Sequence, residues 1–372
     1  MSYTTSRIRE RFIFKRVDWL DFGTTDSEIA EYGQFTGGTI SRGAYTTLKT
    51  SAQLTFTGEA PDTTDLVRVY YRFEDEAGTE HTDCLGTFLV GYDTTAYVPD
   101  GSGLVSSGTV TGSSTLKVLS DRLCGLPLTI PAGTDPIAYA VGLIRSCGLP
   151  CNYPTGTAYA LANAHTFEPE DSYLTVCNWC MTNCPTQFQA LWPDVYGVVQ
   201  VQPYQDPTTR SAVWTFADDA ASILLPNVSE ETSWQGSANV VRLYYEDDTC
   251  AMWASAENLS GGRSSLDVRG GRETTYTERV DEIADLTALK ALAVTRLRDR
   301  AAEIEHVSIG HAFAPIGAGD PVAVIYGGVR WAGTVQNMDI TLAPGAMCTT
   351  QLRRYVSSAL TIQVDGAEIW RA

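Results

Sequence analysis

The sequence is poor in charged side chains, in histidine and in long apolar runs. Charged residues make up 19% of the chain, below the roughly 25% of ordinary globular domains, and only four of the 372 residues are histidine. No window of about 18 apolar residues exists, so no segment is predicted to span a membrane. The N-terminus lacks the apolar core of a secretion signal, because the run 12–14 is far too short.

Motifs of common enzymes are also missing. There is no Gly-x-Ser-x-Gly elbow, no His-Glu-x-x-His pair and no glycine-rich phosphate loop ahead of a helix. His306 and His311 are five positions apart in a strand-like region, which places them on opposite faces. His81 and His165 lie in a turn and a loop, with no partner nearby in sequence. We therefore predict that the chain is not an enzyme and assign it no catalytic or cofactor-binding residue.

Carboxylates and tryptophans keep two alternative functions open. Glu168, Glu170 and Asp171 lie near the start of a predicted helix, where acidic side chains favour the helix dipole and the free amides. A peptidoglycan hydrolase needs two carboxylates across a cleft, which sequence alone does not test. The tryptophans never occur at the i, i+2 spacing of one strand face, so packing explains them better than a glycan-binding face. They are Trp19, Trp179, Trp192, Trp214, Trp234, Trp253, Trp331 and Trp370.

A group of cysteines is the sharpest candidate for a metal site. Cys177, Cys180 and Cys184 share one face of a predicted helix, and Cys147 and Cys151 lie nearby in sequence. Four such thiols could hold zinc or an iron–sulfur cluster. Only Cys177 and Cys180 have Cys-x-x-Cys spacing, however, and cysteine also packs as a small hydrophobe. The sequence favours core packing of reduced thiols, leaves metal binding or a disulfide open as alternatives and assigns no metal ligand.

The charge balance is strongly acidic, with a formal net charge of −18 and a pI near 4.6. Such a surface repels nucleic-acid phosphates and anionic membranes, so neither sequence-specific nucleic-acid binding nor membrane insertion is expected. Abundant Gly, Thr and Ser, together with many Tyr and Trp, are typical of a β-rich protein with many turns. The length suggests two or three domains.

The first predicted domain, 1–112, is β. Val67, Val69, Tyr71 and Phe73 alternate with Arg68, Tyr70 and Arg72, the pattern of a half-buried strand. A turn is predicted at 74–78, and further strands at 44–48, 53–57 and 84–92.

The second predicted domain, 113–228, is an inserted α+β part. Asp135 can cap a helix that begins at Pro136 and ends before Gly148. Further helices are predicted at 114–123 and 169–184, and a hairpin at 188–202.

The third predicted domain, 229–372, combines returning strands, a connecting helix at about 287–304 and a second β barrel. Asp365 and Gly366 predict a two-residue turn in a C-terminal hairpin. Strands are predicted at 239–246, 321–326, 329–335, 338–342 and 347–354. The run 241–245 echoes 67–71, which indicates either two related barrels or a coincidence of strand patterning.

A series of short motifs in fixed order resembles the central hub proteins of siphophage tail tips and, more distantly, the trimeric hub of contractile phage baseplates. The motifs are GTISRG (38–43), LKTSA (48–52), STLKVLSD (114–121), PAGT (131–134), CGL (147–149), LWPDVYG (191–197), GDPV (319–322), GTV (333–335) and LAPG (342–345).

The resemblance implies two small β barrels of tail-hub type, separated by the inserted part. It implies a homotrimer whose six barrels adapt a hexameric tail tube to a threefold tip and line a channel for DNA. The implied partners are tail tube and distal tail proteins, the tape-measure protein and tail fibre or tip proteins. We expect a structural component of the virion tail tip, made in the host cytoplasm. The alternatives are a host-glycan or receptor binder and a peptidoglycan hydrolase. Deletion of 358–372 is expected to weaken assembly without unfolding the barrels.

Overall fold

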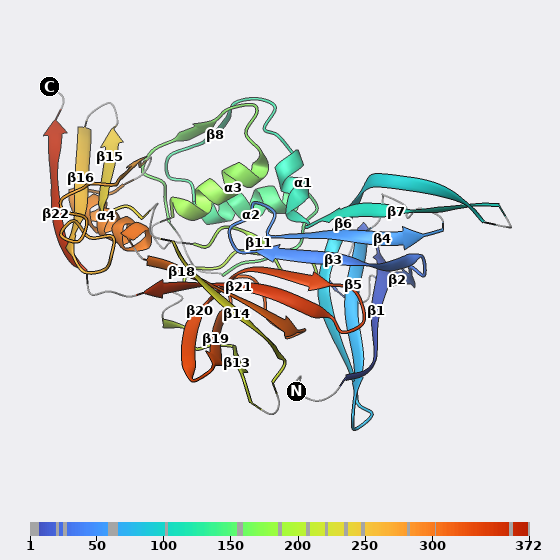
Figure 1. Cartoon of the computed structure of the whole chain (residues 1–372). Helices are drawn as coiled ribbons and strands as arrows, with labels where there is room; N and C mark the ends of the chain where they lie inside the picture. Colours follow the sequence, from blue (N-terminus) through green and yellow to red (C-terminus); the bar gives the residue numbers. More distant parts are fainter. Residues whose placement is uncertain are drawn as a thin grey trace. The chain divides into compact units, whose positions relative to one another are not determined.

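The computed structural model describes residues 7–19, 22–24, 28–58, 66–100, 103–154, 159–184, 188–205, 209–219, 222–233, 237–246, 250–280, 283–301, 303–356 and 360–370. Within these ranges the chain is mainly β, with twenty-two strands and four helices (Figure 1). None of these helices is long and apolar enough to cross a membrane. The chain divides into two compact units. The first comprises Met1–Ala160, Ala164–Val228 and Ser308–Gln351, and the second Leu161–Asn163, Ser229–Val307 and Leu352–Ala372.

Thirteen strands form one large sheet. They are β1 (Arg7–Val17), β2 (Glu28–Glu31), β3 (Phe35–Gly43), β4 (Thr50–Thr57), β5 (Leu66–Asp75), β6 (Glu80–Asp100), β7 (Gly103–Ser113), β13 (Trp214–Ala217), β14 (Leu224–Ser233), β18 (Glu303–Ala312), β19 (Pro321–Tyr326), β20 (Val329–Thr341) and β21 (Met347–Val356). Eleven of them follow one another in the order β14-β18-β21-β20-β3-β4-β7-β6-β5-β1-β2. The other two lie off this path: β19 pairs antiparallel with β20, and β13 pairs parallel with β19. Among the described strands no pairing joins the two ends of this path into a closed barrel.

The inserted part lies between β7 and β13. It consists of α1 (Leu116–Asp121), β8 (Leu128–Ile130), α2 (Pro136–Ser146), β9 (Cys151–Asn152), β10 (His165–Phe167), α3 (Tyr173–Thr182), β11 (Trp192–Pro193) and β12 (Val199–Gln200). Helix α3 packs against both α1 and α2, and the short strands pair as β10-β8 and β11-β12-β9. The predicted class, mainly β with an inserted α+β part, is confirmed.

The predicted helix caps are largely correct. The Asp135 side chain accepts hydrogen bonds from the amides of Ile137 and Ala138, and Pro136 is the first residue of α2. Gly148 follows this helix with a φ of +75°, which a glycine adopts without strain. The start of α3 was predicted too early, because the Ser172 hydroxyl accepts from the Thr175 amide and caps the helix there.

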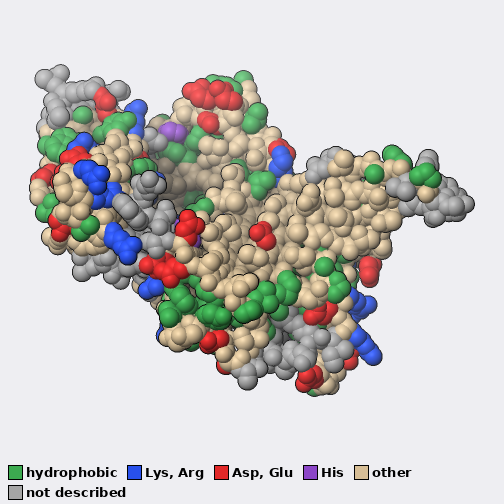
Figure 2. All heavy atoms as spheres, in the orientation of Figure 1, with side chains coloured by type: hydrophobic (Ala, Val, Ile, Leu, Met, Phe, Trp, Pro, Cys, Tyr) green, Lys and Arg blue, Asp and Glu red, His purple; other side chains and the backbone are tan. Residues whose placement is uncertain are grey.

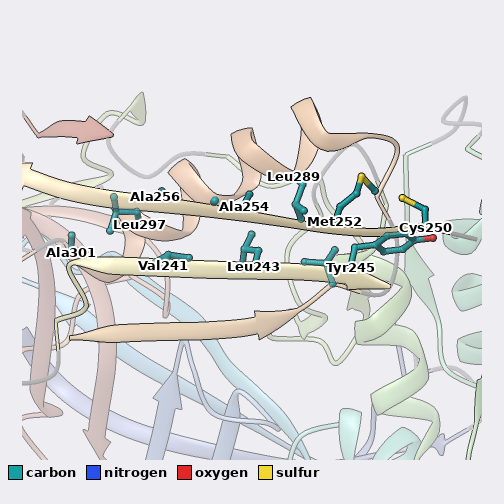
Figure 3. Close-up of a cluster of buried hydrophobic side chains, with 12 residues drawn as sticks. Val241, Leu243, Tyr245, Cys250, Met252, Ala254, Ala256, Leu289, Leu297 and Ala301 are labelled. Carbon is teal, nitrogen blue, oxygen red and sulfur yellow. The ribbon is translucent and has the colours of Figure 1, made fainter. Parts of the chain in front are cut away.

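The second unit is a four-stranded sheet covered by one helix. Its elements are β15 (Val240–Glu246), β16 (Cys250–Ser260), β17 (Thr275–Arg279), α4 (Leu286–Ala301) and β22 (Thr361–Trp370), and the strand order is β17-β15-β16-β22. Figure 3 shows Leu289 and Leu297 pointing from α4 onto the sheet. Ala254 and Ala256 are fully buried beneath the helix, and their small side chains let it approach closely.

Besides the start of α3, four predicted elements or boundaries are wrong. Residues 44–48 form the turn between β3 and β4, where the Lys49 amide donates to the Thr46 carbonyl, and not a strand. Helix α4 ends at Ala301, and Ile304 already belongs to β18. The strands predicted at 329–335 and 338–342 are one strand, β20, because its first half pairs with β19 and its second half with β3.

The fourth error is the C-terminal hairpin. Residues 361–370 form the single strand β22, which pairs antiparallel with β16 along its whole length. Asp365 and Gly366 do not turn, since they lie opposite Ser255 and Ala254 in this ladder. Glycine is needed at 366 for another reason: a Cβ there would lie 2.6 Å from the Trp253 carbonyl oxygen.

Candidate functional site

The five candidate cysteines lie in or near α2, β9 and α3. Cys177, Cys180 and Cys184 are buried, whereas Cys147 and Cys151 are partly exposed. Burial raises the pKa of Cys177 well above its ordinary value and that of Cys180 to about 12, so both thiols stay protonated. Within the described ranges, no three His, Cys, Asp or Glu side chains are placed to hold a metal ion. The buried thiols fill the space between helices as small hydrophobes.

The histidines are engaged in separate places. His311 is fully buried on β18, shares a 2.7 Å hydrogen bond with the Thr350 hydroxyl and lies 4.4 Å from the Phe216 ring. His306 is only partly exposed, five positions away on the same strand. His81 has a partner that the sequence interpretation missed, because the β5–β6 hairpin brings it to 2.9 Å from the Asp75 carboxylate.

Trp179, Trp214 and Trp253 lie on three different elements, α3, β13 and β16. Trp179 stacks on His165 at 4.2 Å, and Trp214 lies 6.3 Å from Phe216. Trp253 is 41% exposed on β16. Trp234 and the Trp370 side chain lie outside the described residues. Glu168 and Asp171 form a turn just before α3, in which the Asp171 carboxylate accepts from the Glu168 amide at 2.9 Å.

A buried arginine forms a junction that the sequence did not reveal. Arg68 on β5 belongs to the set that alternates with the apolar residues of the predicted half-buried strand, yet it is fully buried. Its guanidinium donates to the Thr87 hydroxyl at 3.0 Å, the Thr24 carbonyl at 2.9 Å and the Glu28 carboxylate at 3.2 Å. It also donates to the carbonyl of Phe22. A buried charge is tolerated only with such complete pairing, so Arg68 fixes the 22–28 segment to β5.

The same arginine meets the inserted part. Its guanidinium lies over the Tyr196 ring at 5.0 Å, and the Thr87 hydroxyl donates to the Val195 carbonyl at 3.0 Å. The Asp194 carboxylate closes this turn by accepting from the amides of Tyr196 and Val198, both at 2.9 Å. Burial raises the pKa of Asp194 although these hydrogen bonds oppose the shift. The junction therefore fastens the 194–198 turn to the large sheet.

A pocket of about 620 Å³ opens beside this junction. Trp19, Phe22 and Leu149 supply apolar walls, and Arg145 lies on the rim stacked at 5.0 Å over Tyr153. Asp194 is the only carboxylate among the described residues that line it. A hydrolase of this kind needs two carboxylates across a cleft, and the described lining of this pocket supplies only one.

Much of β3, β4 and β7, together with residues 94–99 of β6, carries no charged side chain. Runs 35–41, 50–58, 94–99 and 101–116 contain no Asp, Glu, Lys or Arg, although the chain has 44 acidic and 26 basic residues. Cross-strand rows of hydroxyl side chains cover one face of these strands, for example Thr55, Thr109 and Thr94 on β4, β7 and β6. Figure 2 shows the broad area without charged side chains over these strands. We name it the uncharged face.

The fold is that of phage tail proteins. The chain matches the tail protein from Neisseria meningitidis MC58 with a TM-score of 0.63 at 13% identity, over 92% of this chain and 97% of that one. It matches the 43 kDa tail protein of prophage MuSo2 from Shewanella oneidensis with a TM-score of 0.60 at 12% identity, over 92% and 97%. Prophage tail protein gp18 from Listeria monocytogenes EGD-e gives 0.52 at 13% identity, over 93% and 95%. No protein-family model and no curated protein matches the sequence.

Proposed function

We propose that the protein is a structural subunit of a bacteriophage tail, located in the virion and assembled with other tail proteins. The observation that carries this proposal is the length of the shared fold: the match to the Neisseria tail protein covers 92% of this chain and 97% of that one. The Shewanella and Listeria tail proteins repeat this coverage.

The finer proposal is a trimeric hub at the tail tip. Three copies would adapt a sixfold tube to a threefold tip through two small β barrels per copy and would line a channel for DNA. The division at 1–112, 113–228 and 229–372 belongs to this proposal, as do the tail tube, distal tail, tape-measure and fibre proteins as neighbours. An acidic chain with net charge −18 suits such a channel, because like-charged walls do not retain DNA.

Light scattering on the purified chain tests the hub. The chain has a mass of 40.4 kDa, so a trimer has three times 40.4, or about 121 kDa. We expect this species either with the chain alone or after addition of the tail-tube protein. A species that stays at 40.4 kDa with and without the tail-tube and distal tail proteins contradicts the proposal. Absence of cell-wall clearing on a zymogram checks the prediction that the chain is not a hydrolase.

A further inference from the structure

Helix α4 covers one face of the four-stranded sheet in the second unit. Val241, Leu243 and Tyr245 of β15 belong to the core beneath this helix (Figure 3). Successive side chains of a strand point to opposite faces, so Arg242 and Tyr244 lie on the other face, where both are exposed. We name it the outer face. Two cross-strand rows on it run from β17 through β15 and β16 to β22: Arg279, Tyr244, Trp253 and Ala367 in the first, and Thr277, Arg242, Ser255 and Asp365 in the second.

The first row holds two exposed aromatic side chains in adjacent positions. Tyr244 lies directly opposite Trp253, and the two are 42% and 41% exposed. Residues paired in this way have Cβ atoms about 5 Å apart, so both side chains occupy one small area of the outer face. The sequence did not reveal the pair, because its members come from two strands and not from the i, i+2 positions of one strand.

The second row contains an unsatisfied hydroxyl. Ser255 is 6% exposed, and its Oγ has no hydrogen-bond partner among the described residues. In the ladder it lies between Arg242 and Asp365, two positions along β16 from Trp253 and on the same face. A buried hydroxyl without a partner destabilises the folded chain. Ser255 is therefore ready to form a hydrogen bond with a ligand that is held by the aromatic pair.

We propose that the outer face binds an uncharged glycan of pyranose units through Trp253, Tyr244 and Ser255. One face of a pyranose ring presents mainly C–H groups, which pack on an aromatic ring, while the hydroxyls project from the edge of the sugar. A sugar stacked on Trp253 brings its hydroxyls to the second row. Each sugar hydroxyl both donates and accepts, so it suits the Ser255 hydroxyl, the Arg242 guanidinium and the Asp365 carboxylate.

The charges around the aromatic pair favour an uncharged ligand. Arg242 and Arg279 adjoin the pair on the outer face, and Glu246 and Asp365 balance them. A polymer that carries uronic acids or phosphates gains nothing from such a balanced site and is repelled by the net charge of −18. A protein partner fits less well, because the centre of a protein interface is depleted of the charged residues that adjoin this pair.

This glycan site goes beyond the proposed function, which requires no small ligand. The site lies within one chain, so it does not depend on how many copies a tail contains. In a tail protein, the natural source of an uncharged glycan is the polysaccharide of a bacterial surface.

Binding of the purified full-length chain to immobilised hexasaccharides tests the site. The panel holds linear hexamers of glucose, galactose, mannose and N-acetylglucosamine, with hexagalacturonate as the acidic member. We expect the wild-type chain to bind an uncharged hexamer, and Trp253→Ala to weaken this binding by about tenfold or more. Trp253→Phe, which keeps a flat ring, should lose less. Tyr97→Ala is the matched control, because Tyr97 is 69% exposed on β6, outside the four-stranded sheet, and should leave binding unchanged.

Ser255→Ala distinguishes a ligand contact from a structural one. The change removes an unpartnered hydroxyl, so the unfolding temperature should stay the same or rise, while glycan binding weakens by about fivefold. A hydroxyl with a structural role gives the opposite result: a lower unfolding temperature with unchanged glycan affinity. Calorimetry and surface plasmon resonance on the same preparation measure both quantities.

The remaining outcomes are equally decisive. A wild-type chain that binds no uncharged member of the panel overturns the glycan site, and so does stronger binding of hexagalacturonate. Glycan binding that is unchanged in Trp253→Ala is also contrary to it. If the chain binds no glycan and Trp253→Ala impairs association with the tail-tube protein, the aromatic pair is a protein contact and the proposal is wrong. None of these results affects the trimeric hub, whose test is the mass of the assembly.

Discussion

Glu28 illustrates how a single carboxylate couples the fold to pH. It is held by Lys15, by the Tyr70 hydroxyl and by Arg68 at 3.2 Å. Burial opposes ionisation, but these hydrogen bonds outweigh it and lower the pKa of Glu28 below its ordinary 4.5. Because the folded pKa lies below the unfolded one, the stabilisation is present above about pH 4.5 and is lost as pH falls through the folded pKa.

We therefore expect Glu28→Gln to lower the free energy of unfolding by about 2 kcal/mol at about pH 7, and by clearly less at about pH 3. Urea unfolding at the two pH values measures the difference. Glu31→Gln is the control on the same strand, since Glu31 is exposed, and it should have little effect at either pH. If Glu28→Gln lowers the free energy of unfolding as much at about pH 3 as at about pH 7, this coupling is contradicted.

The cysteines offer a second prediction at the scale of single residues. The thiols of Cys177 and Cys180 are buried and have raised pKa values, so they lack both access and the reactive thiolate. We expect iodoacetamide at about pH 8 to modify the partly exposed Cys147 first and Cys177 only after denaturation. Peptide mass spectrometry gives the order. Protection of Cys147 by equimolar zinc would instead favour the metal site that the sequence left open.

Among the elements, those set by local chemistry were predicted best. Asp135, Pro136 and Gly148 define α2 through caps and backbone angles that involve only neighbouring residues. The wrong predictions concern residues whose environment is set by segments that are distant in the sequence. Gly366 reads as a turn residue, but its lack of a side chain serves close approach to Trp253. Arg68 alternates with the apolar residues of its predicted strand, but segments far away in the sequence cover it.

The corrected role of β22 changes the expected result of truncation. Leu360, Ile362 and Val364 pack against the core beneath α4, and β22 pairs along the whole of β16. Deletion of 358–372 should therefore destabilise the four-stranded sheet itself, contrary to the expectation for a free hairpin. Hydrogen exchange of the β16 amides should accelerate, with the β5 amides as an internal control. Gly366→Ala, whose Cβ would lie 2.6 Å from the Trp253 carbonyl oxygen, should produce a milder form of the same effect.

At the scale of the whole molecule, charge and fold point to the same behaviour. Each copy carries a net charge of −18, so copies repel one another as they associate. Salt screens this repulsion, with a Debye length of about 10 Å at 0.1 M. An interface built on the uncharged face gains nothing from low salt. Raising the salt concentration from about 0.05 to about 0.5 M should therefore tighten self-association, by about tenfold, in sedimentation velocity.

An association of the wild-type chain that weakens as salt rises would show that charged groups dominate the interface. In that case the copies would meet through the charged remainder of the surface and not through the uncharged face.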